Sequence, residues 1–213
     1  YYTELQRPRL GGSRPGRLLL RLIGAAEQAL SRSASAVVTV DERIARRYHN
    51  RRVVVVGHYP PRDFAVTAGL DTAPVTPAQP AKAATLVYAG RFSTDRGLLV
   101  IATALQRLAQ QNLHPRLRLL GTWTSAAEEA AFAPALAGLD AQLDPAGWIP
   151  FDQVPEQLQQ CDIALAVLQP IERYVVALPV KLFEYMACGL PVIASDFPPV
   201  RAVVAAADCG ILV

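Results

Sequence analysis

The stretch that decides the fold spans residues 179–199 and reads PVKLFEYMACGLPVIASDFPP. Proline is favoured at the first position of a helix, where its missing N–H is not needed, so we expect a helix to begin at Pro179. Gly189 suits the end of that helix because glycine readily adopts the left-handed conformation of a C-terminal cap. Pro191 then opens the apolar run 192–194 (VIA). The stretch therefore predicts a helix followed closely by a buried strand.

Similar short apolar runs recur through the second part of the chain, separated by stretches with a helical pattern. They are 85–89 (TLVYA), 117–120 (LRLL), 163–168 (IALAVL) and 192–194 (VIA), with weaker ones near 143–148 and at 211–213. Such alternation is typical of βαβ units and of a parallel sheet covered on both faces. We predict an α/β fold with a doubly wound parallel sheet. Because the chain ends inside a predicted strand, we expect it to be a fragment.

The first part of the chain is basic. Residues 1–62 hold 12 arginines and four acidic residues, a net charge of +8, so the remainder carries about −5 of the total of +3. Residues 17–32 show apolar spacing typical of an amphipathic helix with an arginine-rich exposed face. Two interpretations stay open: contact with an anionic surface such as lipid headgroups or a lipid-phosphate acceptor, or a solvated helix face.

Further elements are expected around this helix. Residues 34–40 (ASAVVTV) and 52–56 (RVVVV) read as strands, and Asp41 is placed to cap a helix over 42–48. Residues 67–84, rich in Ala, Pro and Thr, read as a connection. We predict one domain over 1–62 and, after the connection, a second within 63–213.

Composition limits the class of protein. With 213 residues and 52% hydrophobic content the chain can bury a full core, and no apolar run reaches the length of a membrane span or forms a signal peptide. The three cysteines are odd in number and lack C-x-x-C spacing, and the histidines show no ligand spacing. We expect reduced thiols, no metal and a cytoplasmic protein, peripheral at most to the inner face of the membrane.

The junction after 85–89 contains Gly90-Arg91 and then Arg96-Gly97. Ligands of open parallel sheets bind where strands end and helices begin. Two guanidinium groups at such a junction are suited to a diphosphate, although they also fit a solvated surface.

The helix expected from Pro179 offers the second cluster. Free amides of its first turn favour an anion, and Glu184 could accept hydrogen bonds from ribose hydroxyls. The alternative for Glu184 is an ion pair with Lys181, three residues earlier. Trp123 and Trp148 are expected to be packing residues, with Trp148 the better candidate for the edge of a base.

These motifs, in this order, resemble those of GT-B glycosyltransferases of retaining family four. Residues 179–198 resemble the form P-x-K-x-x-E-Y-M-A-x-G-x-P-V-I-A-S-D, and 90–97 resembles the loop G-R-x(4)-K-G, with Arg96 in place of lysine. Residues 117–121 resemble the next strand and its glycine turn. The resemblance covers nearly the whole chain, and implies that 1–62 ends an acceptor-side Rossmann-like domain while 63–213 holds the donor domain.

The resemblance implies transfer of a sugar from a nucleoside-diphosphate sugar to a hydroxyl of a glycan or lipid-linked acceptor, in polysaccharide or glycolipid synthesis and without metal. Arg91 and Arg96 would contact the diphosphate, as the catalytic cations, and Glu184 the ribose. The other implied donor-binding residues are Gly90, Gly121, Trp148, Ile149, Ala177, Leu178, Pro179, Val180 and Lys181.

One departure from the family pattern concerns the sugar end of the site. Many members carry a second glutamate eight positions before the ribose-binding one, where this chain has Val176, and Glu172 does not align without a shift. The acceptor-binding residues of the first domain are also missing, so we expect the chain alone to be inactive. A non-catalytic nucleotide-sugar-binding or scaffolding module therefore stays open. A dinucleotide-dependent oxidoreductase is a third option for the sheet pattern, but no G-x-G-x-x-G follows any strand, which argues against NAD binding, and no motif for reading nucleic acid is present.

Overall fold

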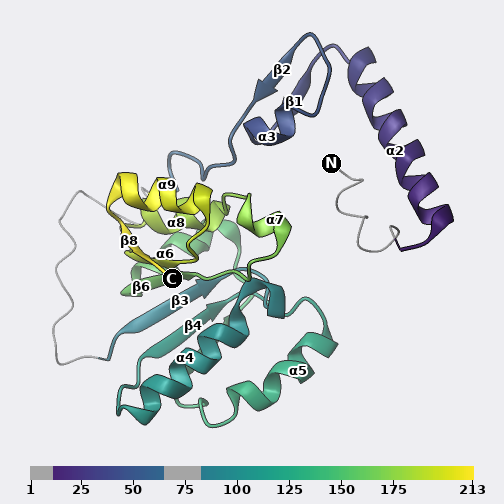
Figure 1. Cartoon of the computed structure of the whole chain (residues 1–213). Coiled ribbons are helices and arrows are strands. Elements are labelled where there is room, and N and C mark those ends of the chain that lie inside the picture. The colour runs from purple at the N-terminus through teal and green to yellow at the C-terminus, as the bar shows by residue number, and fades with distance from the viewer. Residues whose placement is uncertain (1–11, 65–82) are drawn as a thin grey trace. The chain divides into compact units, whose positions relative to one another are not determined.

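The structure is a computed structural model that describes residues 12–64 and 83–213 (Figure 1). The chain divides into two compact units, Tyr1–His58 and Tyr59–Val213, and each is described by itself. The predicted domain boundary after residue 62 stays a prediction. The predicted connection over 67–84 lies outside the described residues up to residue 82.

Within residues 12–58, the part of the first unit that the structure describes, there are one long helix, a short helix and two strands. These are α2 (Arg14–Ser33), β1 (Val37–Thr39), α3 (Glu42–Ala45) and β2 (Val53–Val55). β1 and β2 are parallel, with Val37 opposite Val53. The predicted cap is confirmed, because the Asp41 carboxylate accepts the Ile44 N–H at 2.7 Å. α2 begins before the predicted residue 17, because Ser13 accepts the Gly16 N–H and so caps an earlier turn.

The second unit is built on six parallel strands in the order β5-β4-β3-β6-β7-β8. The strands are β3 (Thr85–Ala89), β4 (Arg116–Leu120), β5 (Leu143–Gly147), β6 (Ile163–Ala166), β7 (Val192–Ala194) and β8 (Gly210–Leu212). The main helices are α4 (Leu98–Gln110), α5 (Ala126–Leu136), α6 (Val154–Gln159), α7 (Glu172–Val175), α8 (Val180–Ala187) and α9 (Pro198–Ala207), with 3₁₀ turns η2 (Thr94–Arg96) and η3 (Phe151–Gln153).

Helices cover both faces of this sheet, as Figure 1 shows. Along β3, Tyr88 joins a core with α4 and α5, whereas its neighbours Val87 and Ala89 join a second core with α6, α8 and α9. Alternate side chains of a strand point to opposite faces, so one strand serves both cores. The predicted doubly wound parallel sheet is confirmed.

The strand order reverses between β3 and β6. From β3 the chain adds β4 and β5 on one side, then returns through α6 to place β6, β7 and β8 on the other. In open α/β sheets the crevice beyond the carboxyl ends of the strands at such a reversal is where ligands bind. The reversal therefore locates the region in which a site is expected.

The helix predicted to begin at Pro179 is present, but its first residue is different. Pro179 has extended backbone angles (φ −72°, ψ 130°) and is the N-cap, so α8 begins at Val180. The prediction of proline at the first helical position was wrong by one residue. The free amides of the first turn remain, because no side chain caps them.

No helix within the described ranges combines the length and the apolar character needed to cross a bilayer.

Two glycines allow the ends of β3 and β4 to approach closely. Gly90 N donates to Leu120 O at 2.8 Å and Gly121 N donates to Gly147 O at 2.7 Å, which extends the ladder past the strand ends. Gly121 has φ +144°, and a Cβ there would lie 1.9 Å from Gly90 O. No side chain fits at residue 121 without moving the loop that follows β3.

We expect Gly121→Ala to destabilise the chain more than Gly138→Ala. Both glycines have positive φ, but a Cβ at Gly138 meets nothing within 4 Å. Gly138→Ala should therefore cost only the backbone strain of about 1–2 kcal/mol, and Gly121→Ala roughly 1–3 kcal/mol more for the added overlap. Urea unfolding of both variants measures the difference, and equal costs would contradict the proposed close approach.

Candidate functional site

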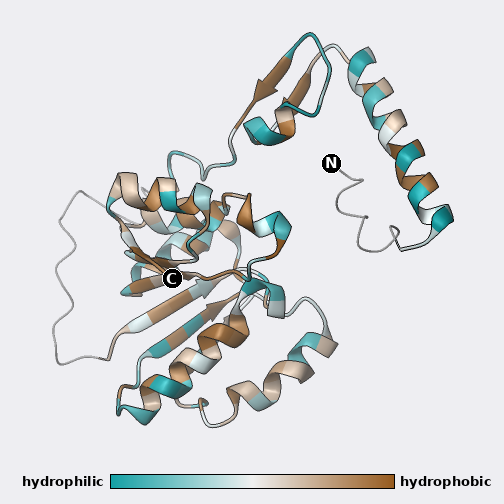
Figure 2. Cartoon of the chain, viewed as in Figure 1, coloured by the Kyte–Doolittle hydropathy of each residue, from teal (hydrophilic) through white to brown (hydrophobic). Residues whose placement is uncertain are grey.

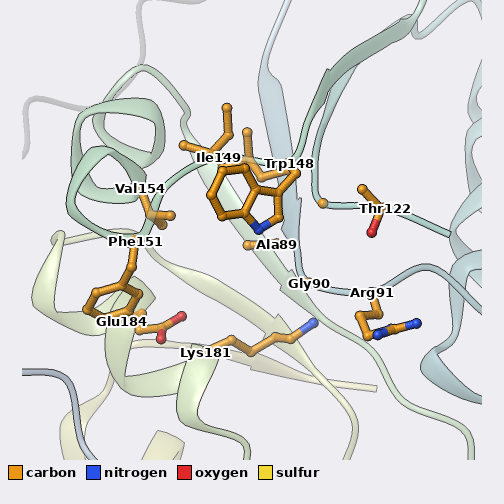
Figure 3. A pocket seen from close by; sticks show the side chains of 12 residues that line it. Ala89, Gly90, Arg91, Thr122, Trp148, Ile149, Phe151, Val154, Lys181 and Glu184 are labelled. Atoms are coloured by element: carbon orange, nitrogen blue, oxygen red, sulfur yellow. The ribbon is translucent and has the colours of Figure 1, made fainter. Parts of the chain in front are cut away.

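A pocket of about 290 Å³ opens at the carboxyl ends of β3 and β4 and the start of α8 (Figure 3). Its lining brings together segments that are distant in the chain. The lining residues are Ala89, Gly90, Arg91, Leu120, Gly121, Thr122, Trp148, Ile149, Phe151, Val154, Lys181 and Glu184. Seven of the predicted site residues thus lie around one cavity: Gly90, Arg91, Gly121, Trp148, Ile149, Lys181 and Glu184.

Lys181 extends across the bottom of this pocket toward the loop after β3 (Figure 3). Its Nζ is buried, has no hydrogen-bond partner among the described residues, and lies 3.9 Å from the centre of the Tyr88 ring. Burial, and next the positive charge of Arg96, lower the pKa of Lys181 from 10.5 to about 7, while Glu184 acts in the opposite direction. The pocket thus contains an amine that is easily deprotonated.

The two predicted diphosphate-binding arginines are not placed alike. Arg91 lines the pocket, is exposed, and donates from Nη2 to Thr124 O at 3.4 Å. Arg96 does not line the pocket, and its guanidinium lies 5.9 Å from the centre of the Tyr174 ring of α7. Its charge nevertheless acts on Lys181 and on Tyr88.

An ion pair and a backbone hydrogen bond connect the loop that carries Arg96 to the segment around α7. Arg173 and Asp95 form an ion pair of 2.5 Å, and Gln169 N donates to Asp95 O at 3.1 Å. Arg173 also lies 4.8 Å from the centre of the Tyr174 ring. The position of Arg96 therefore depends on residues 169–174, more than seventy positions later in the chain.

Glu184 lies one turn after Lys181 on α8, and its carboxylate faces the pocket (Figure 3). No hydrogen bond joins it to Lys181 Nζ. The carboxylate lies on the opposite side of the cavity from Arg91 in the close view, so a ligand that reaches both must be elongated and polar at both ends.

The other wall of the pocket is apolar. It is formed by Trp148, Ile149 and Phe151, which lie between β5 and α6, and by Val154, the first residue of α6. Trp148 is 72% exposed, so the expectation that it is a packing residue was wrong: it follows β5, an edge strand of the sheet, and no element among the described residues covers it. Trp123 does pack, against Phe92 and Phe132 at ring-centre distances of 5.4 and 5.2 Å.

Some predicted residues lie outside the pocket lining. Ala177, Leu178, Pro179 and Val180 are half-buried residues that lead into α8 but do not line the cavity. Val176 ends α7, and Glu172 is exposed in the first turn of that helix, also outside the cavity. The lining residues that sequence reasoning missed are Ala89, Leu120, Thr122, Phe151 and Val154, of which only Phe151 and Val154 had a signal, since they follow the segment 147–149.

Within the described ranges no three His, Cys, Asp or Glu side chains are grouped so that they could hold a metal ion. The expectation that the protein works without metal stays a prediction.

A family profile described as glycosyl transferases group 1 matches residues 83–213, which is more than half of the chain. The chain belongs to this family. The resemblance seen in the sequence motifs is thereby confirmed. Comparison with curated proteins gave no match.

Solved structures of glycosyltransferases share the fold of this group 1 chain. WaaG, a glycosyltransferase involved in lipopolysaccharide biosynthesis, is 18% identical with a TM-score of 0.67 and matches 100% of this chain and 59% of its own. Anabaena Alr3699/HepE in complex with UDP is 16% identical with a TM-score of 0.62, over 89% of this chain and 53% of its own. The chain thus spans little more than half the length of these proteins.

The depressed pKa of Lys181 makes a prediction about stability. Between about pH 7 and 10.5 the unfolded chain binds a proton at this lysine that the folded chain does not, so the stability of the wild-type protein rises with pH across this window. Lys181→Met removes this dependence. The free energy of unfolding of the variant should therefore exceed that of wild type by the largest amount near pH 7. This difference should shrink by roughly 1 kcal/mol for each pH unit above about pH 7.

Urea unfolding of both proteins at several pH values measures this difference. Arg107→Met, which removes an exposed cation from the last turn of α4, is the matched control and should show a constant difference from wild type. A constant difference for Lys181→Met as well would contradict the buried position of its amine.

Proposed function

We propose that this group 1 chain is the donor-binding half of a glycosyltransferase that uses a nucleoside-diphosphate sugar and a hydroxyl acceptor, with retention at the transferred sugar. One observation carries the proposal. At the reversal of strand order, a single pocket joins two basic side chains, Arg91 and Lys181, to a carboxylate, Glu184, and to an apolar wall that includes an exposed indole, Trp148.

Each part of such a donor has a chemical counterpart in the pocket. Guanidinium and ammonium groups bind the diphosphate, and the uncapped first turn of α8 adds the positive end of a helix dipole. The Glu184 carboxylate accepts hydrogen bonds from the ribose hydroxyls. Trp148 and Ile149 offer apolar surface to the base. The crystal structures of Anabaena Alr3699/HepE with UDP and with UDP-glucose support this class of donor.

The same cations serve the reaction. The bond between the anomeric carbon and the phosphate oxygen breaks, the acceptor oxygen bonds to that carbon, and the hydroxyl proton of the acceptor passes to an oxygen of the leaving diphosphate. Negative charge grows on the leaving diphosphate, so Arg91, Arg96 and Lys181 stabilise the transition state more than the ground state. In this proposal the cationic side chains and the helix amides neutralise the charge of the diphosphate, which a divalent metal ion does in other enzymes, so no metal is needed.

The acceptor is proposed to be a glycan or a lipid-linked sugar, as in polysaccharide and glycolipid synthesis. WaaG, which shares the fold, is involved in lipopolysaccharide biosynthesis. A non-catalytic nucleotide-sugar-binding module is the second candidate, because Val176 stands where many family members carry a carboxylate. Transfer activity in the intact protein that contains this chain separates the two.

Peripheral contact with the cytoplasmic face of a membrane is proposed for α2. Its surface exposes Leu18, Leu22 and Leu30 together with Arg14, Arg17 and Arg21. Figure 2 shows hydrophobic and hydrophilic residues interspersed along α2. Apolar side chains that enter the headgroup region and arginines that pair with anionic lipids are the features of interfacial helices. The occupant of this surface is thus an anionic lipid layer.

The donor is tested first by binding. A thermal shift measured with UDP-, GDP- and ADP-sugars identifies the base, because a ligand that binds the folded state raises Tm.

With the donor so identified, Arg91→Ala should lower kcat/KM of the intact enzyme by about 100-fold or more, as loss of one charge-stabilising donor does. Arg107→Ala, which removes an exposed arginine of α4, is the control. Unchanged turnover of Arg91→Ala, with circular dichroism like that of wild type, would refute the assignment.

The membrane contact is tested by sedimentation with vesicles. The chain should pellet with phosphatidylglycerol vesicles at low salt and much less with phosphatidylcholine vesicles, and added salt should release it. Exchange of Arg14, Arg17 and Arg21 for glutamine should abolish pelleting, whereas Arg107→Gln on α4 should not. Failure to pellet with anionic vesicles would leave α2 a solvated or protein-covered helix.

A further inference from the structure

Lys181 is the most unusual charged group of the second unit. Its Nζ is buried and has no hydrogen-bond partner among the described residues. It lies over the face of the Tyr88 ring, 3.9 Å from the ring centre. A buried ammonium without a hydrogen-bond acceptor is costly, and an aromatic ring compensates only part of that cost. The empty pocket therefore favours the uncharged amine.

The charged and titratable groups around this amine come from every element that packs against it. Tyr88 of β3 lies under it, Arg91 of the following loop shares the pocket, and Glu184 lies one turn further along α8. Arg96 of η2 repels the ammonium, and Tyr174 of α7 faces Arg96. Burial and Arg96 together lower the pKa of Lys181 to about 7, and Glu184 only moderates this.

The main chain leaves room for the amine at the floor of the pocket. A Cβ at Gly90 would lie 3.2 Å from Lys181 Nζ, so the residue at position 90 has no side chain where the amine approaches the loop. Arg91, the next residue, lines the same cavity. An anion that binds Arg91 is thus brought to the side of the cavity that Nζ faces (Figure 3).

We propose that Lys181 takes up a proton from solvent when the diphosphate of the donor binds, so that an uncharged amine in the empty pocket becomes the ammonium that holds the diphosphate. This inference rests on the donor-binding function proposed above. The phosphate oxygens supply the acceptors that the amine lacks and the negative charge that offsets Arg96. The bound state is therefore protonated in a pH range where the free state is not.

Proton uptake makes donor binding depend on pH in a defined direction. Above about pH 7 the free pocket must gain a proton for each diphosphate bound, so affinity falls by up to about tenfold for each further pH unit, until the pKa of the bound state is reached. Below about pH 7 the amine is already protonated and this dependence disappears. UDP itself would not produce this effect above about pH 7, because the last ionisation of its terminal phosphate has a pKa of about 6 and is largely complete by then.

Titration calorimetry with UDP tests the inference. Measurements at about pH 8 in two buffers of different ionisation enthalpy, such as HEPES and Tris, give the number of protons exchanged as the dependence of the observed heat on the buffer. We expect uptake of about one proton per UDP at pH 8 and no uptake at about pH 6. The wild-type chain shows whether a proton is taken up, and the variants identify the residue that takes it.

Variants assign the proton to its residue. Lys181→Met should bind UDP more weakly and take up no proton, whereas Arg107→Met on α4 should behave as wild type. UDP binding with no proton uptake at pH 8, or uptake that survives Lys181→Met, would overturn the inference and leave the donor-binding function intact. Failure of UDP, GDP and ADP alike to bind would instead overturn the donor-binding function, and this inference with it.

Discussion

The approach of two loop backbones, at Gly90 and Gly121, is the constraint on which the site depends. Because Gly121 has no side chain, the ends of β3 and β4 stay joined past their last ladder residues. That contact forms the floor of the pocket and places Arg91 on one side of it. It also leaves space for the Lys181 amine beside Gly90. Helix α8 forms another side of the cavity. It is joined to β3 by a hydrogen bond of 2.9 Å from Ala89 N to the buried Tyr185 hydroxyl.

The second unit tolerates an unfavourable buried amine because the two cores around it are extensive. Tyr88, which lies under the amine, is itself part of the core with α4 and α5, and Leu182, the residue after Lys181, is part of the core with α6, α8 and α9. The lysine is thus held between two packed layers. Its position is set by packing, and its charge is left to respond to whatever occupies the pocket.

Much of the fold could be predicted from the sequence, because apolar runs separated by helical patterns are a local signal of βαβ units. The same rule located Gly90 and Arg91, which lie directly after β3, and it drew attention to the helix α8 that carries Glu184. The rest depends on tertiary structure. The position of Arg96 outside the pocket depends on the ion pair of its neighbour Asp95 with Arg173, which is distant in the chain. The exposure of Trp148 follows from the position of β5 at the edge of the sheet.

The ion pair between Asp95 and Arg173 couples two segments of the chain that would have to change together. It links the loop that carries Arg96 to the segment before α8, although the two paired residues are 78 positions apart in the sequence. An exchange of residues 169–175 with those of a relative would remove the contacts that Asp95 makes with this segment. A graft of α7 should therefore carry η2 with it as a matched set.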